Sequence, residues 1–467
     1  MRETTGAEGR RGALARLLGQ GELAPCVDGV ERPYVDLDAA ASTASLVEVA
    51  KAVNDFLPTY ASVHRGAGWR SRSSTAAYEQ ARQAILHFAG RERDDDIAII
   101  CRNTTEAINH LAFRLDLVPD DVVVTTVVEH HANLLPWRRY STVRYVECTP
   151  EGTFEPEAVA AALREVPRPK LLAVTGASNV SGWLPPIDTL VELSHEAGVP
   201  VLVDAAQLAP HQPLPATADY LAWSGHKMYA PFGSGALVGP RATFAVGDPF
   251  LVGGGAVDLV SLDEVLWNAP PEREEAGSPN VVGAVAFGAA ARALERIGWP
   301  AIRAHDDRLA AGLRDGLAAI PGVRVLGPGP GAPTLPVASF VVEGVHHALV
   351  AARLAAEWGI GVRHGCFCAH PYLLRLLALS PAETAAYRDG VRRGDHMHLP
   401  GATRASASIA TGDAEIDRLL DAVRRIATGE APPVPYEQDP ATGDFYPRGG
   451  DPAWSVLSAM TGGCATG

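Results

Sequence analysis

The stretch "DYLAWSGHKMYAPFGSGAL", from Asp219 to Leu237, guides the interpretation of the rest of the chain. An apolar run typical of a buried strand leads into a Ser-Gly-His turn, then Lys227, then a glycine-bearing loop. Only three lysines occur in the 467 residues, and the other two are Lys51 in a helical pattern and Lys170 before a strand. Lys227 is therefore expected at the carboxyl end of a strand, where open α/β sheets bind ligands. An amine beside apolar strands can have a lowered pKa and act as a nucleophile; a surface loop lysine is the alternative.

Seven apolar runs, one of which ends at that lysine, alternate with helix-like segments. The runs cover residues 96–103, 120–130, 142–148, 169–180, 199–207, 219–227 and 233–240. Segments such as 104–115 and 187–198 lie between them, and the second ends at a glycine that is typical of a helix C-cap. Strands that alternate with helices predict an α/β fold around a largely parallel sheet.

The pattern changes after about residue 295, and four parts are predicted. Residues 1–30 are expected to form an N-terminal arm, a helix followed by a turn, and residues 31–295 a large ligand-binding domain. Residues 296–429 mix helical segments with short strands, which predicts a smaller α+β C-terminal domain. The tail, residues 430–467, is rich in Pro and Gly and is expected to be irregular.

Within the smaller domain, the periodicity assigns individual elements. One long helical segment is expected over 291–320, and further helices over 346–359 and 413–427. Strands are expected over 360–365 and 404–410.

Composition limits the class of protein. The formal net charge of −14 argues against a nucleic-acid partner, because phosphate binding needs clustered positive charge. No apolar run reaches the length of a membrane span, and the start of the chain lacks the apolar core of a secretory signal. The six cysteines are scattered and do not make a disulfide framework, so a reducing, cytoplasmic location is expected.

Polar residues follow three more of the apolar runs. Thr104 and Thr105 begin a helix, where amides and hydroxyls can hold a phosphate. His130 follows a second strand and can lie over a ligand ring, and Asp204 ends a third strand, where a buried carboxylate needs a partner. Helix caps and a structural histidine are the alternatives for each motif taken singly. Together with Lys227, these groups describe a site for pyridoxal 5′-phosphate, which needs a lysine for its aldehyde and a carboxylate for its ring nitrogen.

Ten motifs, in this order along the chain, carry a resemblance to a known family. They are "VDLDAAAS", "YASVHRGAG", "NTTEAIN", "EHHANLLPW", "ASNVSGWLPPI", "VDAAQ", "SGHKMYAPFGSGAL", "EEAGSPNVVGA", "RHGCFCAHP" and "RASASIA". From about Tyr34 to Ala427 the chain resembles the class V, fold type I pyridoxal-phosphate enzymes. Within them it is similar to the SufS-type (type II) cysteine desulfurase and selenocysteine lyase family. The resemblance implies a large domain with a mostly parallel seven-stranded sheet and a smaller α+β domain that carries the cysteine loop.

The resemblance also implies roles around the cofactor. Lys227 would bind it covalently, Asp204 would pair with the pyridinium nitrogen, and Gln207 would donate to the phenolic oxygen. His130 would stack on the ring and take part in catalysis. The phosphate would contact Thr104, Thr105, Ser224 and His226. Ser278 would reach the cofactor of a partner subunit, which implies a homodimer with shared sites.

Substrate contacts follow from the same resemblance. Asn179 and Arg404 would bind the substrate carboxylate, a task that suits the fork of an arginine. Arg363 matches a second arginine near the cysteine loop. His64 and Arg65 lie in the segment that forms the entrance of the site.

The loop "GVRHGCFCAHP", residues 361–371, carries two cysteines between two histidines. Four alternating ligands on an extended strand would span about 20 Å, so a single metal ion is not expected there. The resemblance implies instead that Cys368 is the nucleophile that takes the substrate sulfur. Relatives have two histidines where this chain has Cys366 and Phe367, and a glutamine where it has His370. Cys366 is interpreted either as packing or as a second thiol that receives sulfur.

The predicted function is a pyridoxal-phosphate cysteine desulfurase that converts L-cysteine to L-alanine with a Cys368 persulfide as sulfur carrier. The alternative is another class V reaction in which Cys368 is not the nucleophile: C–S lysis by β-elimination, selenocysteine lysis, transamination or epimerisation. Expected partners are the amino-acid substrate, a second copy of the chain and a sulfur-acceptor protein, with no nucleic acid and no membrane. A non-enzymatic metal or redox sensor is a remote third interpretation.

Overall fold

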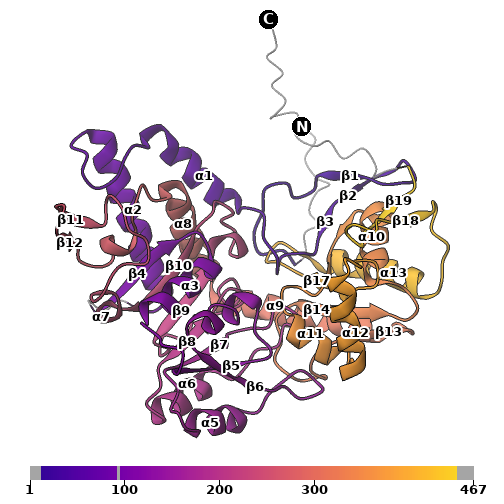
Figure 1. The fold of residues 1–467 in the computed structure, drawn as a ribbon. Helices are drawn as coiled ribbons and strands as arrows, with labels where there is room; N and C mark the ends of the chain where they lie inside the picture. The colour runs from indigo at the N-terminus through magenta and orange to yellow at the C-terminus, as the bar shows by residue number, and fades with distance from the viewer. Residues whose placement is uncertain (1–11, 92–94, 450–467) are drawn as a thin grey trace, which may run out of the picture.

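A computed structural model describes residues 12–91 and 95–449, which form a large and a small sheet with their helices (Figure 1). The large sheet has the strand order β4 (Asp96–Cys101), β10 (Gly235–Pro240), β9 (Tyr220–Ser224), β8 (Val201–Asp204), β7 (Leu171–Thr175), β5 (Val122–Thr126) and β6 (Thr142–Val146). β10 is antiparallel to both of its neighbours, and the other pairs are parallel. The predicted α/β fold with a mostly parallel seven-stranded sheet is confirmed, and each of the seven apolar runs contains one strand.

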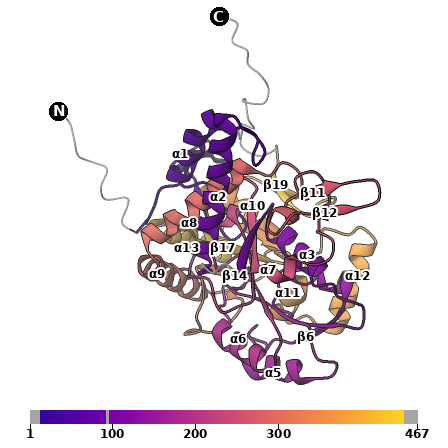
Figure 2. The ribbon, with the colours of Figure 1, turned by 90° about the vertical axis from the view of Figure 1, so that its left-hand side faces the viewer.

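Helices cover both faces of the large sheet, because its strands are apolar on both sides. Along β4, Ile97 and Ile99 join one core cluster and Ala98 joins the other, as the alternation of a strand requires. The Ala98 cluster includes residues of α1 (Val47–Phe56), α2 (Trp69–Phe88), α5 (Pro156–Arg164), α6 (Ile187–Glu196) and α8 (Val281–Ile297). The opposite cluster includes residues of α3 (Thr104–Arg114), α4 (Trp137–Tyr140) and α7 (Arg241–Phe244). Figure 2 shows α8 beside α1 and α2, which it contacts.

The small sheet is antiparallel throughout. Its order is β13 (Val323–Val325), β14 (Val337–Val342), β17 (Ala402–Ser406) and β16 (Arg363–Gly365). It shares a core with α9 (Trp299–Ala318), α10 (His347–Trp358) and α13 (Asp413–Ala427). The β16–β17 register places Arg363 directly opposite Arg404. This pairing brings two guanidinium groups side by side, and both arginines line the pocket described below.

Three predicted elements differ from the structure. The helix expected in residues 1–30 is absent from residues 12–30, where β1 (Leu23–Pro25) pairs with β2 (Glu31–Pro33); residues 1–11 lie outside the described part. The long helix expected over 291–320 is two helices, α8 and α9, because Gly298 has φ +90° and Pro300 lies in the first turn of the next helix. The strand expected over 360–365 is divided, because β15 (Ile360–Gly361) leaves the small sheet to pair with β3 (Val35–Asp36).

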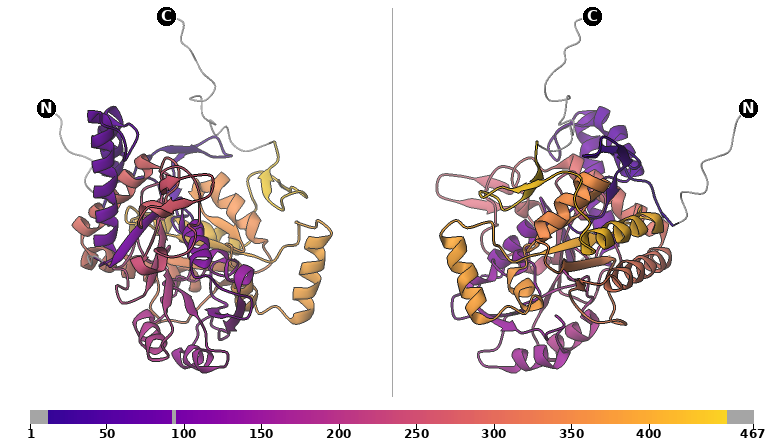
Figure 3. Two further views of the ribbon diagram at one scale, coloured as in Figure 1. Left: turned by 60° about the vertical axis from the view of Figure 1, so that its left-hand side comes forward. Right: turned by 90° about the vertical axis from the view of Figure 1, so that its right-hand side faces the viewer.

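Several elements carry no sequence prediction. They are α11 (His370–Leu376), α12 (Pro381–Arg392) and the hairpin of β11 (Val257–Val260) with β12 (Val265–Trp267). α12 stands at the margin of the molecule (Figure 3). The tail, expected to be irregular, contains a hairpin of β18 (Tyr436–Gln438) with β19 (Phe445–Pro447), and residues 450–467 lie outside the described part.

Within residues 12–91 and 95–449, no helix is long and apolar enough to cross a bilayer.

Candidate active site

A pocket of about 340 Å³ lies at the carboxyl ends of the large sheet's strands, where the cysteine loop of the small half reaches them. Thr175, Asp204 and Ser224, the last residues of β7, β8 and β9, are in its lining. Twelve of the residues predicted for the site line this pocket: Thr104, Thr105, His130, Asn179, Asp204, Gln207, Ser224, His226, Lys227, Arg363, Cys368 and Arg404. The structure therefore brings together residues that are up to 300 positions apart in the chain.

Lys227 and Asp204 are two ionisable residues of the pocket lining. Lys227 ends a short 3-10 turn, Gly225–Lys227, after β9, as the sequence predicts. Burial lowers the pKa of the Lys227 amine to about 8, although Asp204 acts in the opposite direction. Burial raises the pKa of Asp204, and the N–H of Ala206 donates to its Oδ1 at 3.0 Å and works against that shift. An amine that is partly neutral near pH 7 to 8 can act as a nucleophile and as a base.

The start of α3 forms a small polar cradle. Asn103 caps the helix, because its side-chain oxygen accepts from the N–H of Glu106 and satisfies one of the first amides. The Thr104 N–H donates to Ser224 Oγ at 2.8 Å, and the two hydroxyls lie 2.6 Å apart. Gly235 of β10 packs against this turn, where a Cβ would lie 2.8 Å from the Cα of Asn103. Amides and hydroxyls at a helix start suit an anion.

His130 is held as a neutral ring at the wall of the pocket. Its Nδ1 accepts from the Ala132 N–H at 3.1 Å, so the proton of the neutral ring is on Nε2. Burial, followed by the charge of Lys227, lowers the pKa of His130 to about 3. The preceding Glu129 is fully buried and accepts from Asn133 Nδ2 at 2.7 Å and from Thr126 Oγ1 at 2.8 Å. This network fixes the backbone that carries the imidazole.

The cysteine loop enters the pocket as a tight turn. The Ala369 N–H donates to the Cys366 carbonyl at 2.9 Å, and the two central residues, Phe367 and Cys368, both have φ +53°. Left-handed backbone at a non-glycine residue costs about 1–3 kcal/mol. Asn179 Nδ2 donates to the Phe367 carbonyl at 2.7 Å, and the His131 N–H donates to the Cys368 carbonyl at 2.7 Å. These bonds keep the exposed Cys368 thiol in the pocket lining.

Two arginines of the pocket lining, Arg363 and Arg404, share the carboxylate of Asp38, which is not itself in the lining. Arg404 is buried, with its Nη1 donating to the Asn179 carbonyl at 2.9 Å and its Nη2 to Asp38 Oδ1 at 3.1 Å. Arg363 also binds Asp38, through Nε at 3.0 Å and Nη2 at 2.9 Å to Oδ2. The ring of Phe367 lies against Arg404, with 4.9 Å from the guanidinium carbon to the ring centroid. Burial lowers the pKa of Arg404 to about 10.

Three predicted site residues lie outside this pocket. His64 and Arg65 are exposed, and Arg65 Nη2 donates to the Val257 carbonyl at 2.8 Å, at the start of the β11–β12 hairpin. Ser278 is exposed on a different segment. The entrance role of His64 and Arg65 and the contact of Ser278 with a partner's cofactor stay predictions.

Cys366 and His370 lie beside Cys368 in sequence but are absent from the pocket lining. The imidazoles of His370 and His131 are parallel with centroids 5.0 Å apart, and the Tyr387 ring of α12 stacks on His370. Burial raises the pKa of the Cys366 thiol, which suits the packing interpretation. Among residues 12–91 and 95–449, no group of three or more His, Cys, Asp or Glu side chains has an arrangement that could hold a metal ion.

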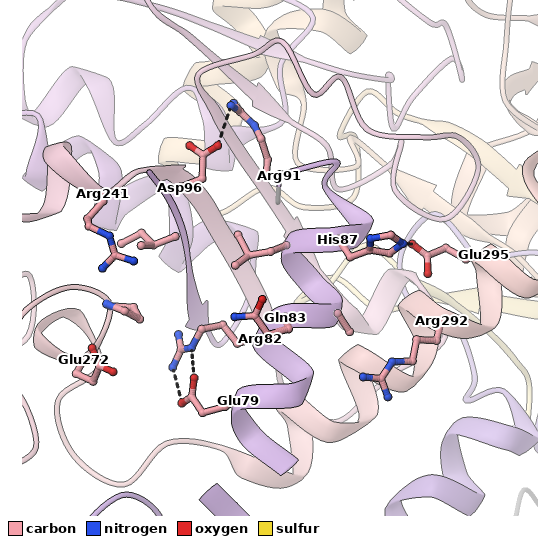
Figure 4. A pocket seen from close by; sticks show the side chains of 14 residues that line it. Glu79, Arg82, Gln83, His87, Arg91, Asp96, Arg241, Glu272, Arg292 and Glu295 are labelled. Carbon is pink, nitrogen blue, oxygen red and sulfur yellow. Dashed lines mark hydrogen bonds and ion pairs between the residues drawn. The ribbon is translucent and has the colours of Figure 1, made fainter. Parts of the chain in front are cut away.

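A larger cavity, about 800 Å³, lies elsewhere, between α2, α8 and the edge of β4 (Figure 4). Its charged side chains include two ion pairs, Arg91 with Asp96 at 3.2 Å and Arg82 with Glu79 at 3.1 Å. None of the residues predicted for the site lines it. The chemistry of the chain is therefore concentrated in the smaller pocket.

Sequence reasoning missed two contributors to the site. Asp38, which binds both arginines, lies within the quoted motif "VDLDAAAS". The motif drew attention to this segment of the chain, but nothing in the sequence indicated that Asp38 binds Arg363 and Arg404. Phe367 was noted only as a departure from relatives, and its contact with Arg404 depends on the turn. Both roles follow from strand pairing and backbone conformation.

Comparisons with known proteins place this chain in a family. The family model described as aminotransferase class-V matches residues 35–419. A probable cysteine desulfurase from Mycobacterium leprae is 36% identical over 75% of this chain and 86% of its own length. A cysteine desulfurase from Dickeya dadantii is 35% identical over 85% of this chain and 92% of its own length. The apo structure of a cysteine desulfurase from Thermococcus onnurineus has a TM-score of 0.75 and 30% identity, covering 85% of this chain and 95% of that one.

The chain therefore belongs to the class-V aminotransferase family, with the fold type I architecture of its structural neighbours. Within that family it is a cysteine desulfurase-like enzyme, because relatives of this name match it over most of both chains. The family is known for its dependence on pyridoxal phosphate.

Proposed function

We propose that this chain is a pyridoxal-phosphate cysteine desulfurase that converts L-cysteine to L-alanine and carries the sulfur as a persulfide on Cys368. The observation that carries the proposal is the shared pocket of Lys227 and Cys368. A lysine amine with a lowered pKa and a thiol in one small cavity provide both groups that the reaction needs. Burial of Arg404 in the same lining adds a receptor for the substrate carboxylate.

The donor set of the pocket fits the cofactor. The cradle of Thr104, Thr105 and Ser224 suits the phosphate, and His226 lies next to it in the lining. Asp204 suits the pyridinium nitrogen, and a protonated pyridinium would lower its raised pKa. We assign Gln207 to the phenolic oxygen; its Nε2 also donates to the Ala40 carbonyl at 2.7 Å, which fixes its orientation. His130 supplies the ring for stacking.

Pyridoxal phosphate, when bound, withdraws electrons from the substrate Cα, which makes the Cα proton acidic and weakens the Cβ–S bond. The Lys227 amine accepts the Cα proton, because a pKa of about 8 leaves much of it neutral. Burial and the charge of Lys227 lower the pKa of His130 to about 3, so its ring is neutral near pH 7 and carries its proton at Nε2.

Cys368 performs the sulfur transfer. Its thiolate attacks the substrate sulfur, so an S–S bond forms while the Cβ–S bond breaks and its electron pair stays on Cβ. A proton on Cβ then completes the methyl group of alanine, the Lys227 ammonium returns a proton to Cα, and the persulfide remains on the enzyme. The turn held by Asn179 directs the thiol into the pocket, and the second amide N–H of Asn179 is assigned to the substrate carboxylate.

Arg404 is the main carboxylate receptor in this proposal. Its Nε is buried and has no hydrogen-bond partner within the described residues. Nη1 and Nη2 each donate to one protein acceptor, and a guanidinium has five N–H donors, so donors remain for a substrate carboxylate. Arg363 is assigned to the same region of the substrate.

A homodimer is part of the proposal. The β11–β12 hairpin presents exposed apolar side chains, among them Leu259, Val260 and Leu262, and Arg65 donates to its first residue. Ser278 is exposed as well, as a contact to a partner's cofactor requires. Apolar patches of this kind mark association surfaces. A sulfur-acceptor protein and a cytoplasmic location complete the proposal, because a thiol carrier needs a reducing compartment.

The experiment supplies L-cysteine to the cofactor-loaded protein and measures alanine, pyruvate and sulfur. We expect alanine with an equal amount of transferred sulfur, and neither product from Lys227→Ala. Pyruvate in place of alanine would instead support β-elimination, the alternative that Phe367 and Cys366 in the loop leave open. Lys51→Ala, an exposed lysine on α1 paired with Asp55, is the matched control and should behave as wild type.

A further inference from the structure

His131 bonds to both ends of the short stretch that begins with the nucleophile. Its backbone N–H donates to the Cys368 carbonyl at 2.7 Å. The Nε2 of its ring accepts from the His370 N–H at 3.2 Å, two residues further along the chain. His131 is not in the pocket lining, although its neighbours His130 and Ala132 are. Any effect of His131 on the reaction therefore passes through the residues that it holds.

The second of these bonds completes the start of α11, which begins at His370. The first N–H groups of a helix have no partner within the helix. Ala369, the residue before α11, has no side-chain oxygen that could accept from them, and Pro371 has no N–H. The ring of His131 accepts from the first amide of the helix in place of such a cap. This bond ties the end of the cysteine loop to the segment after β5.

The ring of His131 is a neutral acceptor with a fixed orientation. An imidazole accepts at Nε2 only when that nitrogen carries no proton, so the proton of the neutral ring is on Nδ1. Burial lowers the pKa of both His131 and His370, which keeps the two rings neutral near pH 7. The His370 Nδ1 lies 3.2 Å from the same Nε2, and the two rings are parallel. The Tyr387 ring of α12 stacks on His370, so contacts from α11 and α12 hold this arrangement.

The backbone of His131 is anchored independently of the cysteine loop. It begins a 3-10 turn, His131–Asn133, in which the buried Asn133 donates from Nδ2 to Glu129 at 2.7 Å. The nucleophile that it holds needs such support, because Cys368 is exposed and has a left-handed φ of +53°. A rigid segment therefore holds a strained turn in place.

We infer that His131 is a positioning residue for sulfur transfer: its backbone N–H and its ring Nε2 fix residues 368–370, so the Cys368 thiol stays where it reaches the substrate sulfur. The inference rests on the proposed function and deepens it, because it concerns the transfer step alone. Removal of the Cα proton by Lys227 needs no thiol and does not depend on these two bonds. A displacement of a reacting atom by about 1 Å can cost about a hundredfold in rate, so loss of one bond should slow the transfer.

Two amide variants separate the ring acceptor from a general need for a polar side chain. In His131→Gln the amide oxygen can reach the position of Nε2, whereas in His131→Asn the shorter side chain places it near Nδ1. Both variants keep the backbone N–H that binds Cys368. In a single turnover of the cofactor-loaded protein with L-cysteine, we expect persulfide formation on Cys368 to slow at least about tenfold in His131→Asn. His131→Gln should stay within about threefold of the wild type.

Two further measurements show which step is affected. Exchange of the Cα proton of L-alanine in heavy water needs the cofactor and Lys227 but no thiol, so it should be unchanged in both variants. Amide hydrogen exchange, followed by mass spectrometry, should be faster at residue 370 in His131→Asn and unchanged in His131→Gln. Equal transfer rates in the two variants would overturn the inference. So would an unchanged amide exchange in His131→Asn, or a loss of Cα exchange as large as the loss of transfer.

His370→Gln tests the same bond from the donor side, because it changes the ring of residue 370 and keeps the backbone N–H. Its transfer rate should stay within about threefold of the wild type. A loss as large as that of His131→Asn would contradict the inference.

His131→Leu covers the case in which His131→Asn does not fold, since it also removes the acceptor and should show the same selective loss. A wild-type transfer rate in His131→Leu would overturn the inference. Failure of the proposed function is a separate result: wild type would then make no alanine from L-cysteine, whereas amide exchange at residue 370 still tests the bond to His131.

Discussion

The Lys227 amine lies in the pocket with a pKa that burial lowers to about 8. Only the neutral amine attacks an aldehyde, and half of it is neutral at about pH 8 rather than near pH 10.5. We predict that the rate at which cofactor-free protein captures pyridoxal phosphate rises through pH 8 and levels off above about pH 9. Stopped-flow absorbance at a series of pH values measures this rate. Lys227→Ala should give no borohydride-fixed cofactor at any pH, and a rate still rising steeply at pH 10 would refute the lowered pKa.

Asn179 holds the turn that carries the nucleophile. Asn179→Ala would leave the buried Phe367 carbonyl without its 2.7 Å donor, which costs about 1–3 kcal/mol. We predict a fall of that size in the free energy of unfolding, measured with urea, together with slower alanine formation. Asn109→Ala, which removes an exposed amide bound to the Thr105 carbonyl, is the matched control and should cost less.

Site residues that directly follow a strand could be predicted from the sequence. Site residues whose role depends on which strands pair with each other could not. Asp204 and Lys227 could be predicted because parallel strands end at one edge of a sheet, so residues after strands must converge. Asp38 could not, because its two partners become neighbours only through the register of β16 with β17. No local pattern in a sequence encodes such a long-range register.

The β11–β12 hairpin is the element that tests the proposed dimer. Leu259 and Leu262 are exposed on it, and an apolar hairpin in water is explained if a second copy covers it. We predict that Leu259→Lys/Leu262→Lys raises the dimer dissociation constant at least about tenfold in sedimentation experiments, because charges would be buried. Val166→Lys changes an equally exposed valine elsewhere and should leave association unaltered. A wild-type protein that is monomeric at all concentrations would contradict the dimer.

Some boundaries of helices and strands differ from those that the local sequence pattern predicts. The break between α8 and α9 was present in the sequence as Gly298 and Pro300, but the apolar periodicity continued across it and favoured one helix. The division of residues 360–365 had no local signal, since β15 turns away to pair with β3, more than 300 positions earlier. The α12 helix was missed because most of its side chains face solvent and its pattern is weak.

For the whole molecule, the buried imidazoles predict sensitivity to acid. Burial lowers the pKa of eight histidines, to about 3 for His130 and about 4 for His226 and His347. Below about pH 6.5 the unfolded chain binds protons that the folded chain does not, so stability is full above that pH and falls toward pH 4. Burial raises the pKa values of three carboxyls, to about 8 for Glu129 and upward for Asp36 and Asp204, and these act in the opposite direction, but the eight histidines outnumber them. We predict a lower thermal midpoint at pH 5 than at pH 7.

A stability that is constant from pH 7 to pH 5 would contradict this account of the histidines. His347→Gln should reduce the slope of stability with pH, because it removes an imidazole whose pKa burial lowers to about 4.

The central claim is that Cys368 takes sulfur from L-cysteine, and a single turnover tests it most directly. Cofactor-loaded protein receives one equivalent of L-cysteine without reductant, is alkylated, and is then mapped by peptide mass spectrometry alongside alanine analysis. The predicted result is up to one alanine per subunit, a persulfide located on Cys368 rather than Cys366, and no alanine burst from Cys368→Ser. An alanine burst of wild-type size from Cys368→Ser would contradict the account.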